Sequence, residues 1–528
     1  MHADGDDAVK REDTDTADTP RIEALLTAAQ AYPRLEALMM AAREEVVMGF
    51  RIFDTRTHLV SEQARALGET WGDLLLHTAN RGVRITLMIS DFDVIVGPDL
   101  HEGAWRTVEA IRVLNERSAP EAAKILVNPV LHPAKAGIVP QMLLALTTRK
   151  KLQGIAKDIN NSADPKDRFD HMPGLKDMAY FEDGKVRVNR TALPRPRPVT
   201  LHHKMAIFDG EITYIGGLDL NERRFDDMEH DTAAQESWHD VQMVYHDAQV
   251  AQDARDYLDA LPDVIDRRAT FAEPSGTLRV TLSRKRASNI WRLAPEKLFT
   301  GLLEAHLSEI ARATQFIYLE TQYFRDRRIA KALSAAGKRN KDLKLIVLLP
   351  AAPEEALEDK SPGIETRFGE YLQARALRHV RRAFGERFLA VSAVQQRKPD
   401  TRDVDLDRAT LEGAPLIYVH SKLAIFDDRC AIVSSANLNG RSMKWDSEAG
   451  LVLQDHAQVE MLKDKVFEGW LGEDRECGPD TAFSCWVSRA LHNAQQQPKD
   501  RTGFIVPYDL KAATVAGMPV PGAPEELV

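Results

Sequence analysis

Two copies of one short pattern carry the side chains that could do chemistry in this chain. The pattern reads His-x-Lys-x-x-x-x-Asp, and its copies occupy residues 202–209 and 420–427. The six defining residues are His202, Lys204, Asp209, His420, Lys422 and Asp427. A single His-x-Lys is common, but two copies that both continue into similar segments imply two structurally equivalent halves. Each half would then bring one imidazole and one ammonium to a shared place.

A phosphodiester is the kind of group that these side chains suit. Lysines and backbone donors can hold its non-bridging oxygens. A neutral imidazole can attack phosphorus, and a protonated imidazole can donate a proton to the leaving oxygen. The sequence therefore predicts a covalent phosphohistidine that passes to water or to another alcohol. The reaction needs two histidines and two lysines, and it requires no metal or other cofactor.

Other polar residues near the two motifs are expected to support them. An imidazole is oriented by a carboxylate on its other ring nitrogen, and Asp240 and Glu448 are the candidates. Asp209 and Asp427 open turns, so we expect them to tie backbone groups there. Small residues after each motif would let the backbone approach a bound anion. The expected phosphate-contacting residues of these return segments are Gly217, Asp219, Ser435 and Asn437.

Composition limits the class of protein. The chain has 528 residues, of which 44% are hydrophobic and 28% charged, an ordinary globular balance. No apolar run is long enough for a transmembrane helix. The net charge of −10 disfavours a sequence-independent grip on nucleic acid. The polar, acidic start lacks the features of a secretory signal, which favours a cytoplasmic or peripheral membrane location, with signal-independent export as the alternative.

Alternating strand-like and helix-like patterns predict an α/β fold. Strands are expected at 45–54, 83–89, 316–320 and 343–350, and helices at 21–43, 295–313 and 327–337. The predicted organisation is a disordered leader (1–20), a first lobe (21–267, insertion 131–187), a linker (268–294), a second lobe (295–490, insertion 351–415) and a tail (491–528).

One part of the first insertion permits two interpretations. Residues 134–157 combine an apolar run at 142–146 with Arg149, Lys150, Lys151 and Lys157. A buried helix with a basic exposed end is the favoured interpretation. Contact with a membrane surface is the alternative.

Only three cysteines occur in the chain. Cys430 falls in an apolar run and is expected to be packed there. Cys477 and Cys485 are close enough to pair, although two free thiols are the commoner outcome in a cytosolic protein.

These motifs resemble the phospholipase D superfamily, and within it the phosphatidylcholine-hydrolysing branch. The resembling segments are 201–204, 214–220, 238–241, 317–324, 417–422 and 435–442. The resemblance implies two similar αβαβα lobes with mainly parallel sheets, related by a pseudo-twofold, with the active site at the seam. It implies His202 as nucleophile and His420 as acid and base, and it adds Glu320 and Gln322 as substrate-binding candidates. Asp219 stands where many members have Asn.

The resulting prediction is a phospholipase D, a phosphodiesterase that releases phosphatidic acid and the head-group alcohol, with transphosphatidylation. Its expected partners are a glycerophospholipid and, transiently, the membrane surface, and the expected oligomeric state is a monomer. A cardiolipin or phosphatidylserine synthase is the first alternative. A nuclease and a non-catalytic lipid-binding module are further alternatives, disfavoured by the acidic net charge and by the completeness of both motifs.

Overall fold

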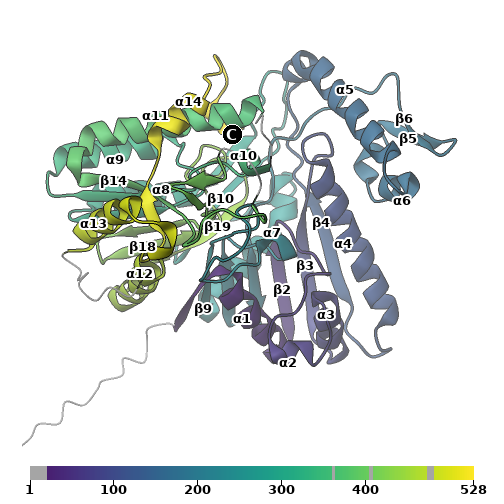
Figure 1. The fold of residues 1–528 in the computed structure, drawn as a ribbon. Helices are drawn as coiled ribbons and strands as arrows, with labels where there is room; N and C mark the ends of the chain where they lie inside the picture. Colours follow the sequence, from purple (N-terminus) through teal and green to yellow (C-terminus); the bar gives the residue numbers. More distant parts are fainter. Residues whose placement is uncertain (1–20, 359–362, 404–407, 473–480) are drawn as a thin grey trace, which may run out of the picture.

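The computed structural model describes residues 21–358, 363–403, 408–472 and 481–528 (Figure 1). The predicted leader, 1–20, lies outside these ranges. The first half contains β1 (Ile22–Leu26), α1 (Thr27–Ala41), β2 (Glu45–Phe50), α2 (Glu62–Arg65), α3 (Trp71–Asn80), β3 (Arg84–Asp91), α4 (Pro98–Arg117), β4 (Ile125–Leu131), α5 (Ile138–Asn160), α6 (Pro165–Asp170), β5 (Ala179–Glu182), β6 (Lys185–Val188), β7 (Met205–Phe208), β8 (Ile212–Gly216), β9 (Val241–His246) and α7 (Ala248–Ile265).

The second half repeats much of this order. It contains β10 (Leu278–Arg284), β11 (Glu296–Thr300), α8 (Gly301–Arg312), β12 (Phe316–Glu320), α9 (Arg327–Arg339), β13 (Lys344–Leu348), α10 (Glu355–Glu358), α11 (Ile364–Phe384), β14 (Phe388–Ala393), β15 (Thr410–Leu411), β16 (Ala414–Pro415), β17 (Leu423–Phe426), β18 (Cys430–Ser434), β19 (Glu448–Leu453), α12 (His456–Leu471), α13 (Ala482–Gln495), β20 (Ile505–Pro507) and α14 (Leu510–Ala516).

Seven strands take the same spatial order in the two large sheets. The first sheet runs β1-β9-β8-β7-β2-β3-β4, and the second contains β10-β19-β18-β17-β12-β13-β14, with β11 and β20 added at its edges. Parallel pairing joins β2, β3 and β4, and likewise β12, β13 and β14. The other neighbours in these sheets are antiparallel, because hairpins connect β7 to β8 and β17 to β18. The predicted α/β class is confirmed.

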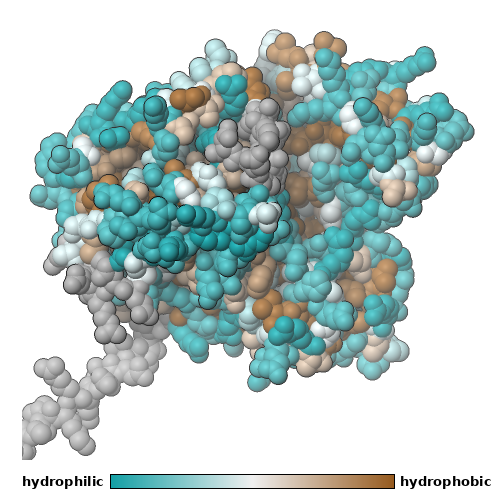
Figure 2. Space-filling view, in the orientation of Figure 1, coloured by the Kyte–Doolittle hydropathy of each residue, from teal (hydrophilic) through white to brown (hydrophobic). Residues whose placement is uncertain are grey.

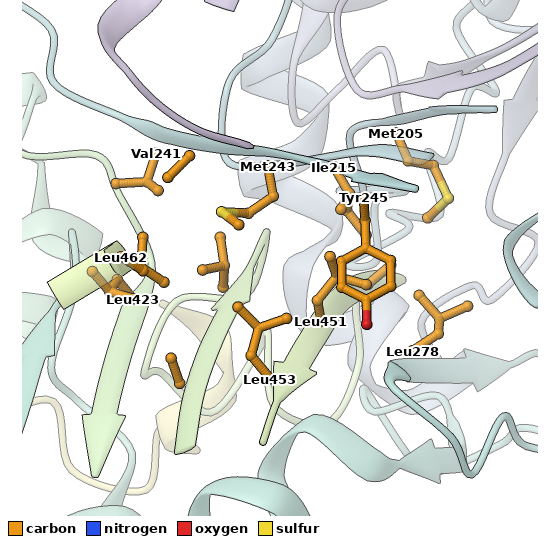
Figure 3. Close-up of a cluster of buried hydrophobic side chains, with 14 of the residues drawn as sticks. Met205, Ile215, Val241, Met243, Tyr245, Leu278, Leu423, Leu451, Leu453 and Leu462 are labelled. Atoms are coloured by element: carbon orange, nitrogen blue, oxygen red, sulfur yellow. The ribbon is translucent and has the colours of Figure 1, made fainter. Parts of the chain in front are cut away.

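One face of each sheet packs against the other sheet. Figure 3 shows Val241, Met243 and Tyr245 of the first half facing Leu423, Leu453 and Leu451 of the second, all within one buried apolar cluster. A second cluster joins the outer face of the first sheet to α1 and α3, and a third joins the second sheet to α8, α9 and α11. Helices α7 and α12 belong to the inner cluster as well, because α7 contacts both β8 and β10 and α12 contacts both β1 and β18. The order of layers is therefore outer helices, first sheet, a largely apolar seam that includes α7 and α12, second sheet, and outer helices.

Local signals account for several element ends. The side chains of Asp247 and Asp455 accept hydrogen bonds from the first turns of α7 and α12, at equivalent places in the two halves. Gly82 follows α3 with a φ of 88°, a conformation that favours glycine.

The structure corrects four predicted boundaries. The 268–294 segment is more than a linker, because it contains β10, which pairs with β19. The 351–415 segment is largely scaffold, because α11 and β14 occupy the places of α4 and β4. The tail contributes β20, which pairs with β14. Finally, β1 and β11 precede α1 and α8 where the pattern predicted helix throughout: β1 pairs with the distant β9, and β11 pairs with the preceding β10.

The remaining predictions on local structure have mixed outcomes. The helix predicted in the first insertion exists as α5, but its apolar run is on the surface rather than buried, with Leu143 81% exposed. Cys430 is buried. Cys485 is disulfide-bonded, against the expectation of a free thiol, and Cys477 lies outside the described residues. Within the described ranges, every helix is too short or too polar to cross a membrane.

Candidate active site

The two motifs meet at the seam, each just before a strand. His202 and Lys204 lie in the extended segment that enters β7, and His420 and Lys422 enter β17 in the same way. Main-chain hydrogen bonds cross the seam beside both histidines. His202 N donates to Ser447 O at 2.9 Å, and His420 N donates to His239 O at 2.8 Å. The backbone of each motif is thus positioned by the other half.

Each histidine is paired with the carboxylate of the opposite half. His202 Nδ1 lies 3.0 Å from Glu448 Oε2, and His420 Nδ1 lies 2.6 Å from Asp240 Oδ2. Both carboxylates are buried, whereas the side chains of His202 and His420 keep 15% and 8% of their exposure. Because Nδ1 faces a carboxylate in both residues, Nε2 is the ring nitrogen left for a substrate. The predicted orienting residues therefore reach the imidazoles, crosswise.

Small residues behind the carboxylates hold them in place. A Cβ atom on Gly217 would lie 2.2 Å from Asp240 Oδ1, so only glycine leaves room for that carboxylate. At the equivalent place, Ser435 Oγ donates a hydrogen bond to Glu448 Oε2. Gly217 and Ser435 were predicted to contact phosphate. In the structure they support the orienting carboxylates instead.

Gly217→Ala is expected to lower kcat by about ten- to hundredfold, because the new methyl group displaces Asp240 and misaligns His420. Steady-state kinetics on a phosphodiester substrate would measure the effect. Gly154→Ala is the matched control, since its Cβ atom meets nothing within 4 Å. An unchanged kcat in Gly217→Ala would refute the proposed support.

The two lysines are buried but differently paired. Lys204 Nζ donates to His202 O at 2.7 Å and lies 3.7 Å from Asp219 Oδ2, which is also 3.7 Å from Arg51 Nη1. Lys422 Nζ donates to His420 O. Asp219 is thus neutralised by two cations, and this arrangement resolves the conflict of a carboxylate beside a phosphate site. Burial lowers the pKa of the Lys204 ammonium, against the attraction of Asp219.

Burial sets the protonation states of the site. It lowers the pKa of both imidazoles well below the usual value, and the neighbouring lysines add to this effect. Burial also lowers the pKa of the Lys422 ammonium to about 7. It raises the pKa of the Asp240 carboxyl to about 6 and that of the Glu448 carboxyl to about 8. The resting imidazoles are consequently neutral at pH 7, and the two orienting carboxyls differ in pKa.

The motif aspartates lie at the far ends of the hairpins. Asp209 follows β7, has a φ of 51°, and accepts hydrogen bonds from the main-chain nitrogens of Arg43, Glu44 and Glu45 at 2.8–3.2 Å. Asp427 does the same for residues 314–316. Although both residues belong to the repeated motif, they have the backbone-tying place expected from the sequence: each carboxylate ties the corner where a helix passes into the strand beside the motif.

Asp209→Ala is expected to lower the free energy of unfolding by about 1–3 kcal/mol, because it leaves main-chain donors of 43–45 without their acceptor. At a temperature where the variant is folded, we expect kcat to change by less than about threefold. Urea denaturation and kinetics would measure the two effects. Asp209→Asn, which tolerates a positive φ and keeps one acceptor, is expected to lose less stability. Loss of activity without loss of stability would contradict the structural role.

The other predicted substrate-binding residues have separate places. Glu320 is fully buried and accepts hydrogen bonds from Ser421 Oγ and, at 2.7 Å, from Tyr318 Oη, so the structure corrects its assignment to substrate. Gln322 and Asn437 bond to each other at 3.0 Å. The Asn437 Oδ1 atom has no hydrogen-bond partner among the described residues, so it is free to accept a bond from a ligand.

Several cations at the site escaped the sequence analysis. Arg51 and Arg441 contribute to the lowered pKa of His202, and Arg224 contributes to that of His420. The Arg224 guanidinium stacks 3.5 Å above the Trp238 ring, whose centroid lies 4.5 Å from that of His420. Only Arg51 carries a sequence signal, since it directly follows β2, at the carboxyl end of a parallel strand where ligands commonly bind. The lysine and arginine side chains at the seam therefore suit the site to a ligand with one negative charge.

Comparisons with known proteins give a family and distant relatives. The family model described as "Cardiolipin synthase, PLD-like domain" matches residues 306–470. Phospholipase D1 of Mus musculus is 25% identical over 276 residues, covering 43% of this chain and 25% of that protein. A phospholipase D of Phytophthora infestans is 30% identical over 177 residues, covering 29% of this chain and 9% of that protein. The chain therefore spans about a quarter or less of the length of these two relatives.

Among solved structures, a phosphatidylserine synthase of Haemophilus influenzae Rd KW20 aligns with 12% identity and a TM-score of 0.44, covering 90% of this chain and 93% of that chain. The family match covers the second motif, and the mouse relative aligns over a longer region. The first motif has the same pattern and the same place before its hairpin as the second. The family match and these relatives support the phospholipase D superfamily as the one that this chain resembles.

Proposed function

We propose that the chain is a phospholipase D that hydrolyses the distal phosphodiester of phosphatidylcholine-type glycerophospholipids. The observation that carries the proposal is the pair of slightly exposed imidazoles, each backed by a buried carboxylate from the opposite half. Supporting it are several relatives that are themselves named phospholipase D. The products would be phosphatidic acid and the free head-group alcohol.

In the first step, His202 Nε2 attacks phosphorus while His420 protonates the leaving head-group oxygen. A P–N bond forms, the P–O bond to the head group breaks, and the lipid remains on His202 as a phosphohistidine. The bound phosphodiester is an anion, and its charge favours the protonated form of His420. Lys204 and Lys422 would hold the non-bridging oxygens as charge develops on them.

In the second step, His420 acts as the base. It takes a proton from water, whose oxygen attacks phosphorus, and the P–N bond breaks to release phosphatidic acid. A primary alcohol can replace water, and the product is then a new phosphatidyl ester. Hydrolysis and transphosphatidylation thus share one intermediate.

The second candidate is a phosphatidyltransferase whose acceptor is the alcohol of another lipid. The family description, a cardiolipin synthase with a phospholipase D-like domain, favours it specifically. The chemistry at the two histidines would be the same. Only the acceptor that reaches the phosphohistidine would differ.

One incubation separates these activities. The protein is mixed with phosphatidylcholine, phosphatidylethanolamine and phosphatidylglycerol plus ethanol, and the lipids are analysed by mass spectrometry. We expect phosphatidic acid together with phosphatidylethanol. Cardiolipin formed from phosphatidylglycerol, with little phosphatidic acid, would favour the transferase. Unchanged lipids together with cleavage of plasmid DNA would refute both in favour of a nuclease.

A further inference from the structure

The first half of α5 presents large apolar side chains to solvent. Ile138, Met142, Leu143 and Leu146 are 51%, 64%, 81% and 78% exposed. Beside them, Ile290 and Trp291 are 47% and 72% exposed. These six residues are called the α5 face here. Figure 2 shows hydrophobic side chains at the top of the molecule, over the region where Figure 1 places the projecting helix α5. So many exposed apolar groups in one place indicate an interaction surface.

Main-chain contacts hold the α5 face together. Val139 N donates to Ile290 O, and Gly137 N donates to Arg292 O, both at 2.8 Å. A Cβ atom on Gly137 would lie 2.6 Å from Ile290 O, so the loop can approach the helix only at a glycine. Ala136 N in turn donates to Pro196 O at 2.8 Å. Three segments distant in sequence therefore build one surface.

The three segments that build the α5 face carry charges of one sign. Residues 133–157 contain five basic residues, 190–201 contain three and 286–295 contain two, and none of the three segments contains an acidic residue. The whole chain, by contrast, has a net charge of −10. Repulsion from Arg197, then burial and Arg195, lowers the pKa of the Lys135 ammonium. A partner that accepts both apolar insertion and a ring of cations is an anionic lipid surface.

The α5 face is continuous with the active site. The segment that passes Pro196 continues to Thr200, whose backbone N donates to Asp446 Oδ1 at 2.8 Å, and then to His202. A cavity of about 550 Å³ has both Trp291 and Trp445 in its lining. Trp445 directly precedes Asp446 and is three residues before Glu448. The α5 face is therefore connected to the first motif by the 196–202 segment, and it shares a cavity with Trp445.

We propose that the α5 face is the surface by which this protein docks on bilayers that contain anionic phospholipids. The apolar side chains would enter the boundary between head groups and acyl chains, and the basic residues would contact lipid phosphates. This inference rests on the proposed function, because docking would bring the proposed active site to the lipid surface that contains its substrate. It also reverses the favoured sequence interpretation of α5 as a buried helix.

The test compares binding with turnover in the full-length protein. Binding is measured by flotation with vesicles of phosphatidylcholine containing phosphatidylglycerol. Leu143→Asp with Leu146→Asp is expected to lower binding by about tenfold or more. Leu491→Asp with Val515→Asp, at residues 52% and 75% exposed on α13 and α14, is the matched control and should bind as the wild type does. Arg149→Gln with Lys150→Gln and Lys151→Gln should weaken binding to anionic vesicles and reduce its dependence on salt.

Turnover of dibutyryl phosphatidylcholine as a monomer is measured in parallel. The α5 variants should keep this activity within about twofold, since the altered residues lie on the surface. A wild type without this activity would count against the proposed function and leave the binding result intact. Docking is overturned if the wild type does not bind vesicles, or if the leucine variant binds as well as the wild type. Docking is also overturned if the α5 face instead forms a dimer. In that case the wild type would be dimeric by light scattering and would not bind vesicles, and the leucine variant would be monomeric.

Discussion

His202→Asn is expected to lower the rate of phosphatidyl transfer by about 10⁴-fold and to leave no lipid bound to the protein. His420→Asn is expected to slow turnover similarly but to accumulate a phosphatidyl adduct on His202 with a substrate whose leaving alcohol needs no protonation. The assignment of His202 as nucleophile and His420 as acid follows from the different pKa values of the two orienting carboxyls. Asp240, with a pKa of about 6, is mostly ionised at pH 7 and favours an imidazolium at His420. Glu448, with a pKa of about 8, is mostly protonated and leaves His202 neutral.

Intact mass spectrometry after an alkaline quench would detect the adduct, because a phosphohistidine survives alkali and is lost in acid. A p-nitrophenyl phosphodiester of a lipid alcohol supplies the leaving group. His456→Asn is the matched control, since the His456 side chain is 69% exposed at the start of α12. An adduct found in His202→Asn but not in His420→Asn would reverse the order of the two histidines. No adduct in either variant would refute covalent catalysis.

The reacting residues could be predicted from the sequence because the motif occurs twice. Both copies place His and Lys before a short apolar strand that ends in an aspartate turn, so one copy serves as a check on the other. The core strands β12 and β13 were found because they are short, apolar runs between helix patterns. The equal strand order of the two sheets is the structural form of the same repeat.

The repeat does not predict that each carboxylate pairs with the histidine of the opposite half. Asp240 and Glu448 each follow their own motif, 38 residues after His202 and 28 residues after His420, so the sequence is equally compatible with pairing inside each half or between halves. The structure decides because the segments before β9 and β19 reach across the seam, where His239 and Ser447 bond to the opposite motif. Contacts between residues about 200 positions apart leave no periodic pattern in a single sequence.

The same limit explains the misread segments. The strands β10 and β20 lie at or near the edges of the second sheet and pair with β19 and β14, which are distant in sequence. The other partner of β10 is β11, which was predicted to be helix. Exposure of the α5 run has a related cause. Hydrophobic periodicity shows that a helix has an apolar face, but not whether another element covers it. That outcome depends on the tertiary fold.

Glu448→Gln is expected to stabilise the protein at pH 8 while lowering kcat by about 10²–10⁴-fold. Burial raises the pKa of the Glu448 carboxyl from 4.5 to about 8, so the folded state holds its proton more tightly than the unfolded state does. The stability of the wild type therefore falls as pH rises from about 4.5 to 8, and the loss is complete above pH 8. Glutamine keeps a neutral side chain at every pH. The variant should exceed the wild type by on the order of 4 kcal/mol at pH 8 and by almost nothing at pH 4.5.

Urea denaturation at the two pH values would measure this difference, and the same preparations would give kcat. The loss of activity follows because an amide cannot become the anion that supports a charged His202 in the covalent intermediate. Glu386→Gln, at an exposed position, is the matched control and should change neither stability nor its pH dependence. If Glu448→Gln were destabilised equally at both pH values, the carboxylate would be a structural acceptor. Burial of Glu448 would then not lower the free energy of unfolding, and the link between its burial and the chemistry of His202 would be lost.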